Sequence, residues 1–549
     1  MLAWAVRLNA VLCVLDLLRP GVGDRLARTS HSALIDGATL ALAVASAGAQ
    51  FVLANGLRRR KRRSWYVTVT LVSLSTVAAH HHEATWSTLT GLVLLVLLIA
   101  GRRHFTAAPG PGTLTHAAQA FAVMLAVSVA AGLTLTEDTA PSARLLPWLG
   151  QTLVGLIGFV PDLPFQRPPQ SDLAATVLPL MGAATALVTL AVLLAPAWRP
   201  PRPSTGDEAA VRELLDRWGE QDSLGYFALR SDKSLVFSAS RKAAVAYGVA
   251  GSVALASGDP LGDPEAWPGA IRAWLDTVQA YGWIPGVLGA SEAGATAYAR
   301  AGLEALELGD EAILELADFT LCGRSMRTVR QAVNRAERSG HRVELDRQRD
   351  LDTDQLAELT SAAAAMRDGD VERGFSMALG RLGDPRDPDL VVARARDADG
   401  RLAAVLVLAP WGRHGLSLDV MRRAHDAENG VVELVVAELA RRGPQMGIER
   451  LSLNFAVFRS TFERGSRIGA GPILRLWRQV LLQASRWWQI ESLYRANAKY
   501  HPTWVTRFVC YRRTGELPRI GIAALEAEAL LVRPRVARLL RPRLGASAR

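Results

Sequence analysis

An aspartate and an arginine stand three residues apart at the end of an apolar, strand-like run, Asp419-Val-Met-Arg422. Side chains at this spacing can share one rim of a pocket. There the carboxylate can hold a ligand ammonium, and the guanidinium can orient a carbonyl or a phosphate through paired N–H donors. The alternative is a mutual surface salt bridge, which contributes little to stability. The spacing alone leaves both interpretations open.

Lys499 is one of only four lysines in a chain whose Lys+Arg total is 63. A lysine ammonium is a compact charge whose pKa falls when it is buried, a property that arginine cannot match. The presence of lysine in Asn497-Ala-Lys-Tyr500, within a chain so biased toward arginine, therefore indicates a chemical role. A chance surface lysine is the competing interpretation.

A strongly basic segment follows the middle of the chain, and only Glu337 opposes its charge. Its arginines are Arg324, Arg327, Arg330, Arg335, Arg338 and Arg342. The first three recur at every third position, which predicts one helix face that Asn334 and Arg338 extend. Such a stripe suits a nucleic-acid backbone, because guanidinium groups grip phosphates and release their counterions. Contact with anionic lipid and an ordinary solvated face remain open.

Other chemical motifs are sparse. The chain has no Walker A, GxGxxG or HExxH motif, and its three cysteines are far apart in the sequence. The turn Gly258-Asp259-Pro260-Leu261-Gly262 could bring backbone close to a ligand or could be a bare tight turn. His80-His81-His82-Glu83 is better explained as a solvated turn than as a metal site. We therefore expect no metal and no cofactor.

Two parts of the chain differ sharply in charge. Residues 1–200 hold 8 acidic and 15 basic side chains, whereas residues 201–549 hold 44 and 48. Several apolar stretches in the first part approach the roughly 20 residues that cross a bilayer. They lie near 33–57, 64–79, 85–101, 115–135 and 173–197, with 1–19 as a weaker candidate. We therefore expect residues 1–198 to form a transmembrane domain of about six helices.

Basic clusters set the expected orientation of these helices. They occur at residues 58–63, at Arg102-Arg103, and at Arg199 and Arg202. If the spans alternate, all three clusters fall on one side, which the positive-inside rule makes cytoplasmic. Residues 145–160 are either a re-entrant segment or an amphipathic surface helix.

A proline-rich linker, residues 199–206, separates the membrane part from the rest. Asp207 or Thr205 is expected to cap the helix that follows. Beyond it, strand-like apolar runs alternate with helical periodicity. The strand-like runs are 234–238, 252–256, 390–395, 402–408 and 451–455, and the helical ones are 267–281, 293–301, 354–366 and 431–442. This length of mixed pattern exceeds one usual core, so two α/β units are expected.

Six motifs in the α/β part match those of a known family. They are Asp222-Ser-Leu-Gly-Tyr-Phe-Ala-Leu-Arg230, Gly258-Asp-Pro-Leu-Gly262, Leu308-Gly-Asp-Glu-Ala-Ile313, Gly374-Phe-Ser-Met377, Leu418-Asp-Val-Met-Arg-Arg423 and Leu493-Tyr-Arg-Ala-Asn-Ala-Lys-Tyr-His-Pro-Thr-Trp504. From about residue 207 to 530 the chain resembles the aminoacyl-phosphatidylglycerol synthases, the multiple peptide resistance factor family. Within that family it is most similar to the lysyltransferase portion of actinobacterial lysylphosphatidylglycerol synthetase.

The resemblance implies a multi-helix transmembrane domain followed by an α/β region of two tandem acetyltransferase-like (GNAT) folds. The expected segments are a first fold over 207–323, a basic bridging helix over 324–342, a catalytic second fold over 343–530 and a basic tail over 531–549. The family's aminoacyl-binding pair matches Asp419 and Arg422, and a lysine of its C-terminal motif matches Lys499. Weaker pocket candidates are Asn454, Ser376, Glu433 and Asp259. The implied tRNA-facing residues are Arg324, Arg327, Arg330, Asn334, Arg335 and Arg338.

The resemblance also implies a function. An aminoacyl group would pass from aminoacyl-tRNA to phosphatidylglycerol at the bacterial inner membrane. The resemblance to the lysyltransferase portion implies that this group is lysyl. The product would reduce the negative surface charge and give resistance to cationic peptides. The similar mycobacterial proteins continue into a lysyl-tRNA synthetase domain, so a separate synthetase is the expected source of charged tRNA here.

Several points stay open at the level of the sequence. One alternative is a lipid flippase or transporter with a regulatory cytosolic domain, and another is tRNA-dependent transfer to a non-lipid acceptor. Alanine or ornithine in place of lysine, and a homodimer, are also left open.

Overall fold

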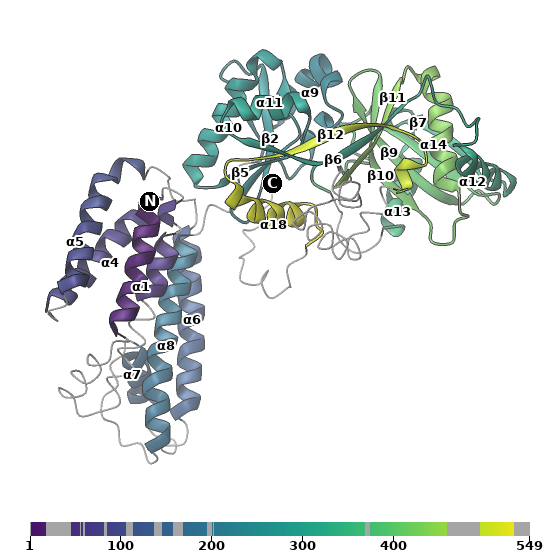
Figure 1. Cartoon of the computed structure of the whole chain (residues 1–549). Helices are drawn as coiled ribbons and strands as arrows, with labels where there is room; N and C mark the ends of the chain where they lie inside the picture. The colour runs from purple at the N-terminus through teal and green to yellow at the C-terminus, as the bar shows by residue number, and fades with distance from the viewer. Residues whose placement is uncertain are drawn as a thin grey trace. The chain divides into compact units, whose positions relative to one another are not determined.

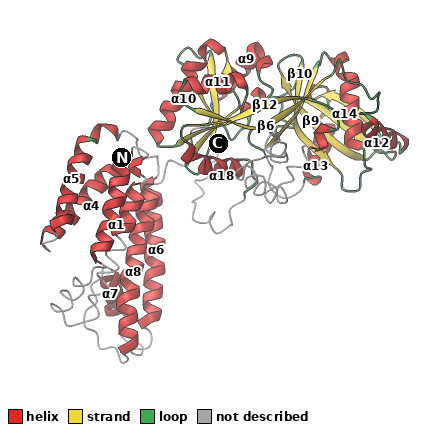
Figure 2. Cartoon of the chain, in the orientation of Figure 1, coloured by secondary structure: helices red, strands yellow, loops and turns green. Residues whose placement is uncertain are grey.

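The computed structural model describes residues 2–17, 46–54, 56–58, 61–81, 85–105, 113–136, 145–156, 168–194, 200, 202–367, 374–457 and 495–531. The chain divides into two compact units, one mainly of residues 1–198 and the other mainly of residues 199–532 (Figure 1). The first unit is helical, and the second combines helices with a large sheet (Figure 2).

Helices of the first unit form at the apolar stretches of the sequence. They are α1 (Leu2–Leu17), α4 (Arg62–His81), α5 (Thr85–Ala100), α6 (Thr113–Thr136), α7 (Leu145–Leu156) and α8 (Pro168–Leu193). Of the stretch 33–57, only residues 46–54 and 56–57 are described, and these are helical. Within the described ranges, one helical segment, Leu114–Gly132, has both the length and the hydropathy to cross a bilayer. Thr88–Ala100 and Val177–Leu193 are apolar but shorter.

The second unit is built on one continuous twisted sheet. Its strands are β1 (Ser234–Phe237), β2 (Ala243–Ala250), β3 (Val253–Ser257), β4 (Leu261–Gly262), β5 (Ile284–Ala290), β6 (Glu304–Glu315), β7 (Arg342–Arg347), β8 (Val391–Arg396), β9 (Leu402–Trp411), β10 (Gly415–Arg423), β11 (Arg450–Val457) and β12 (Thr503–Tyr511). The order across the described sheet is β1-β2-β3-β5-β12-β6-β11-β10-β9-β8-β7, and β4 pairs with β2. All five predicted strand-like runs are confirmed as β1, β3, β8, β9 and β11.

The helices of this unit are α9 (Thr205–Trp218), α10 (Trp267–Tyr281), α11 (Glu292–Arg300), α12 (Arg327–Arg338), α13 (Thr353–Ala365), α14 (Val431–Arg442) and α18 (Leu517–Ala527). Four of them, α10, α11, α13 and α14, form where helical periodicity predicts them. The N-cap of α9 is Ser204 rather than Asp207 or Thr205. Its Oγ accepts a hydrogen bond from Asp207 N at 3.1 Å, and the Asp207 carboxylate accepts from Ser204 N, which completes a capping box.

The sheet does not follow the expected division of the chain into 207–323 and 343–530. β12 lies between β5 and β6 and is antiparallel to both, and α18 packs on β2, β3 and β5 (Figure 1). The last described strand and helix therefore complete the first half of the sheet. Strand neighbours are set by hydrogen bonding in space, and the apolar pattern of β12 does not specify which strands will flank it.

Close packing joins the basic helix to the second half. α14 buries a continuous apolar face that includes Val431, Leu434 and Val435. It begins after Gly430, whose φ is +110°. A Cβ at this position would lie 2.4 Å from the carbonyl oxygen of Ala332 on α12. Glycine therefore lets the start of α14 lie directly against α12.

Candidate active site

The second half of the sheet contains a gap between two parallel strands. β10 and β11 pair over only three residues, from Gly415 with Arg450 to Ser417 with Ser452. β10 then continues along β9, while β11 continues along β6. In the first half, the parallel pair β3 and β5 stays in register over five residues. The strand edges therefore separate in the second half, beyond Ser417 of β10 and Ser452 of β11.

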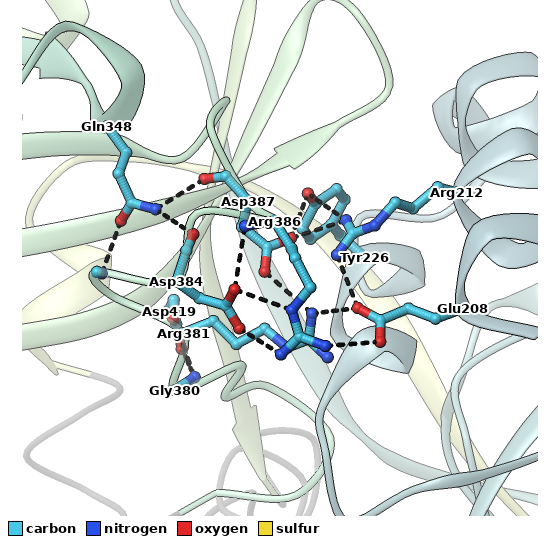
Figure 3. Close-up of polar contacts among 11 residues, drawn as sticks. Glu208, Arg212, Tyr226, Gln348, Gly380, Arg381, Asp384, Arg386, Asp387 and Asp419 are labelled. Atoms are coloured by element: carbon cyan, nitrogen blue, oxygen red, sulfur yellow. Dashed lines mark hydrogen bonds and ion pairs between the residues drawn. The ribbon is translucent and has the colours of Figure 1, made fainter. Parts of the chain in front are cut away.

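Asp419 lies where this separation begins. It occupies an irregularity of β10 between Leu418 and Val420. Its Oδ1 accepts a hydrogen bond from Leu379 N at 2.7 Å, and its carboxylate also accepts from Gly380 N at 3.4 Å (Figure 3). Backbone donors suit an ionised carboxylate and fix its direction.

Asn454 stands opposite Asp419 on the other strand. It adopts a left-handed backbone conformation with φ +69°, at the point where β11 turns away from β10. Its Nδ2 donates to the carbonyl oxygen of Leu418 at 2.7 Å and so bridges the separating strands. Its Oδ1 is buried and accepts no hydrogen bond from the described residues. The gap thus holds a carboxylate and an amide oxygen, both of which suit a cationic amine.

Lys499 and Glu433 come together beside this gap. Lys499 Nζ lies 2.6 Å from Glu433 Oε1, in the first turn of α14, and both side chains are partly buried. Lys499 lies in the turn that follows a short helical segment, residues 495–498. Asn497, whose Nδ2 donates to Leu453 O at 3.2 Å, and the buried ring of Tyr500 anchor this region. Asn497 was not among the predicted site residues, although it lies in the recognised C-terminal motif.

The remaining catalytic candidate and two pocket candidates have other surroundings. Arg422 lies on β10 beyond Asp419, and its Nη1 donates to Met421 O at 3.2 Å. Ser376 is fully buried, and its Oγ donates to Glu528 at the end of α18 at 2.9 Å. Asp259 lies in the first half, where it accepts hydrogen bonds from N and Oγ of Ser291 at 2.8 and 2.5 Å. Ser376 and Asp259 therefore make these contacts away from the gap.

A buried polar network at the seam between the two halves was missed by the sequence analysis. At its centre is Arg507 of β12, which donates to Glu311 at 2.8 and 2.5 Å, to Asp222 at 2.7 Å and to Ser223 Oγ at 2.6 Å. Glu311 also accepts hydrogen bonds from Ser223 and Ser452. The carboxylates lie in quoted family motifs, but nothing in the sequence indicated that an arginine of β12 would pair with them.

This network perturbs the carboxyl group of Asp259. Burial, and next the negative charge of Asp222, raise the pKa of Asp259 from 3.8 to about 7. Arg507 and Ser291 act in the opposite direction but do not cancel these effects. Burial beside Asp222 therefore favours the protonated form of Asp259 in the folded chain.

A second polar cluster fixes the segment that follows Leu379 and Gly380, the residues whose backbone N–H groups donate to Asp419 (Figure 3). Arg381 donates to Glu208 of α9 at 2.5 Å and to the fully buried Asp387 at 3.1 Å. Asp387 also accepts from Arg212 and from Tyr226, both at 2.8 Å. Burial opposes ionisation of Glu208, but the hydrogen bond and charge of Arg381 outweigh it, so the pKa of Glu208 is lowered.

Other contacts hold the same segment from the second half. Gln348 Nε2 donates to the carbonyl oxygens of Asp384 and Asp387 at 2.7 and 3.0 Å, and its Oε1 accepts from Gly383 N at 2.9 Å (Figure 3). The segment is thus fixed by both halves of the sheet.

The basic helix is shorter than the basic segment of the sequence. Arg324 lies in a turn before α12, and Arg342 begins β7. Arg330 donates to Leu321 O at 2.5 Å and to Gly323 O at 3.1 Å, so its guanidinium holds the preceding loop. The exposed polar residues of α12 among the candidates are Arg327, Asn334, Arg335 and Arg338.

No metal centre is evident in the described part of the chain, where no group of three or more His, Cys, Asp or Glu side chains is arranged to hold an ion. His80 and His81 end α4, whereas His82 and Glu83 lie outside the described residues.

Two family models match the chain. The model "Phosphatidylglycerol lysyltransferase, C-terminal" matches residues 212–511, and "Transmembrane region of lysyl-tRNA synthetase" matches residues 1–194. The first match spans more than half of the chain and includes Asp419, Arg422 and Lys499. The second identifies the N-terminal part as a membrane region.

Curated relatives agree with these matches. The lysylphosphatidylglycerol biosynthesis bifunctional protein LysX of Mycobacterium marinum is 46% identical over 500 residues, which cover 88% of this chain and 45% of that protein. LysX of Mycobacterium tuberculosis is 47% identical and covers 88% of this chain, with 42% of its own length matched. The chain therefore spans less than half the length of the curated relatives it matches.

Solved structures with a similar arrangement cover the α/β unit. They include the C-terminal domain of a putative lysylphosphatidylglycerol synthetase from Agrobacterium fabrum, with 24% identity, a TM-score of 0.47, and coverage of 58% of this chain and 96% of that one. Another is L-PGS from Bacillus licheniformis, with 20% identity, a TM-score of 0.48, and coverage of 60% and 98%. The family matches confirm a transmembrane region followed by a phosphatidylglycerol lysyltransferase C-terminal unit, and the division of that unit into tandem GNAT-like folds stays an expectation. The chain belongs to the phosphatidylglycerol lysyltransferase C-terminal family.

Proposed function

We propose that the chain transfers a lysyl group from lysyl-tRNA to phosphatidylglycerol at the cytoplasmic face of the membrane. The observation that carries this proposal is the separation of β10 and β11 after Ser417 and Ser452. There the Asp419 carboxylate and Asn454 Oδ1, which accepts no hydrogen bond from the described residues, lie on the two diverging strands. Because the family match covers this gap, an enzyme is favoured over a transporter with a regulatory domain.

The proposed reaction is a transesterification. The ester bond between the lysyl carbonyl carbon and the tRNA ribose oxygen breaks, and a new ester bond forms to a glycerol hydroxyl of the lipid. The hydroxyl proton ends on the ribose oxygen, so no net oxidation or ATP is needed. The protein's task is to align two large substrates and to stabilise the oxyanion of the tetrahedral intermediate.

Four side chains receive roles in this proposal. The Asp419 carboxylate binds the α-ammonium of the lysyl group, with Asn454 Oδ1 as a second acceptor. Arg422 orients the ester carbonyl or the adjacent phosphate. Lys499 stabilises the oxyanion or binds the lipid phosphate. For this, its ammonium group must leave Glu433, its ion-pair partner in the structure, and contact the substrate.

The other parts of the chain bring the substrates to this gap. Arg327, Arg335 and Arg338 on the exposed side of α12 bind the tRNA backbone, and α12 lies against the start of α14, which carries Glu433. The N-terminal helices hold the enzyme in the membrane as a multi-pass protein. The basic clusters at residues 58–63 and at Arg102-Arg103 favour a cytoplasmic catalytic unit.

The test is a transfer assay with the full-length chain in phosphatidylglycerol vesicles. Radiolabelled lysyl-tRNA is added, and the extracted lipids are separated by thin-layer chromatography. Asp419→Ala should lower lysyl-lipid formation roughly 10²-fold, because the α-ammonium would lose a charged partner. Asp276→Ala, an exposed position on α10, serves as the matched control. Equal product from wild type and Asp419→Ala refutes the role of Asp419, and unlabelled lipid with wild type refutes the function.

A further inference from the structure

The segment from Gly374 to Arg381 connects the last described helix, α18, to Asp419. Glu528, which follows α18, accepts hydrogen bonds from Phe375 N at 2.6 Å and from Ser376 N at 3.1 Å. Its backbone carbonyl also accepts from Gly374 N at 3.2 Å. Three residues further along the segment, the N–H groups of Leu379 and Gly380 donate to Asp419.

A second residue of the first half, Arg230, holds the carbonyl groups of the same segment. Arg230 Nη1 donates to the carbonyl oxygens of Gly374 and Ala378, the second at 3.3 Å. The ring of Phe375 packs closely against Gly248 of β2, where a Cβ would lie 2.7 Å from the ring. Amide groups are thus fixed by Glu528 and carbonyl groups by Arg230.

We propose that Glu528 is a positioning residue for Asp419, acting through the backbone from Phe375 to Gly380. This inference rests on the proposed function, since it concerns how the lysyl-binding carboxylate is aimed. Leu379, whose amide binds Asp419, comes only three positions after Ser376, whose amide binds Glu528, and each peptide unit between them is planar. A change in the direction of Phe375 N or Ser376 N therefore reaches Leu379 N. A displacement of about 1 Å at a reacting group can lower a rate by roughly 10²-fold.

Glu528→Gln tests the link with little change in volume. The amide retains one acceptor oxygen, but its NH₂ group would face the N–H of either Phe375 or Ser376, so one hydrogen bond is lost. We expect kcat/KM for lysyl-tRNA to fall about tenfold, because one hydrogen bond to a charged group is lost. Glu292→Gln, an exposed first-turn residue of α11, is the matched control and should leave kcat/KM unchanged.

A double-mutant cycle separates positioning from general structural damage. If Glu528 acts through Asp419, Glu528→Gln should cost less than about twofold when Asp419 is already replaced by asparagine. A structural role elsewhere would lower kcat/KM by the same factor in both backgrounds and overturn the proposal. Wild-type activity in Glu528→Gln would also overturn it.

A binding measurement keeps the inference distinct from the proposed function. Isothermal titration of the full-length chain with L-lysinamide reports on ammonium binding without any lipid product. Glu528→Gln should weaken this binding about tenfold, and Asp419→Asn should remove the difference. If wild type binds lysinamide but leaves the lipid unlabelled, the proposed function is refuted. The lysinamide affinities of the variants still test whether Glu528 positions Asp419. Equal affinities of wild type and Glu528→Gln, or no binding to wild type, overturn the link.

Discussion

Replacing Arg507 should destabilise the α/β unit more than most single substitutions. Its guanidinium is almost completely buried and neutralises Glu311 and Asp222 at the seam between the two halves. Arg507→Met keeps an apolar stem of similar length but removes every donor. Two buried carboxylates then lose their positive partner.

The expected magnitude follows from these contacts. Removing one partner of a buried ion pair typically costs about 3–5 kcal/mol, because the remaining charge stays buried. The hydroxyls of Ser223 and Ser452 still donate to Glu311, so the middle of this range, about 4 kcal/mol, is reasonable. At roughly 2 °C per kcal/mol for a unit of this size, the Tm should fall by about 8 °C.

The assay is thermal unfolding of the detergent-solubilised full-length chain near neutral pH, followed by tryptophan fluorescence. Arg217→Met is the control, because Arg217 pairs with Glu213 on an exposed helix face and such pairs contribute less than about 1 kcal/mol. Adding Glu311→Gln to Arg507→Met should restore part of the Tm, since one unpaired charge is removed. A fall of less than 2 °C for Arg507→Met, or no recovery in the double variant, would refute this reasoning.

Three further predictions concern charge. Arg327→Glu with Arg335→Glu should raise the KM for lysyl-tRNA about tenfold and flatten its salt dependence, because phosphate contacts are lost; an unchanged KM in transfer assays would favour a merely solvated helix face. The raised pKa of Asp259 means that the folded chain holds this proton more tightly than the unfolded chain, so its contribution to stability is lost as pH rises from about 4 to 7. The Tm of Asp259→Asn relative to wild type should therefore increase between about pH 5 and pH 7.5, and a constant difference would contradict this. Lys499→Met should lower kcat roughly 10²-fold in single-turnover transfer and Glu433→Gln only about tenfold, because Glu433 only holds the lysine; the reverse order would reassign the two roles.

Local sequence patterns were sufficient for most of the secondary structure. The helices expected at 267–281 and 431–442 begin and end at those residues in α10 and α14. Each has apolar residues on one face at helical spacing, and this signal depends only on neighbours along the chain. The strand-like runs at 390–395 and 402–408 became β8 and β9, because a short continuous apolar run is also a signal that depends only on neighbours along the chain.

Contacts between distant parts of the chain were not predictable in this way. Arg507 and Asp222 are separated by 285 positions, and no local periodicity connects them. The scarcity of lysine drew attention to Lys499, yet the fully buried lysine is Lys233. Its Nζ donates to Phe227 O at 2.8 Å and to Ser257 Oγ at 2.7 Å. Burial, and next the charge of Arg230, lower the pKa of Lys233 to about 7. The small number of lysines therefore pointed to lysine as a functional residue type, but it did not show which lysine is buried.

The buried network also explains why β10 and β11 stay apart. Ser452, the last residue of β11 paired with β10, donates to Glu311 and accepts from Asn454 N at 3.2 Å. These bonds hold the left-handed turn at Asn454, from which the amide side chain reaches Leu418 beside Asp419. Apolar residues in place of the whole network, Arg507 and its carboxylate partners included, could pack equally well and even raise stability, but they would leave this turn without its hydrogen bonds. The polar seam therefore holds the turn at Asn454, which links the stability of the sheet to the geometry at Asp419.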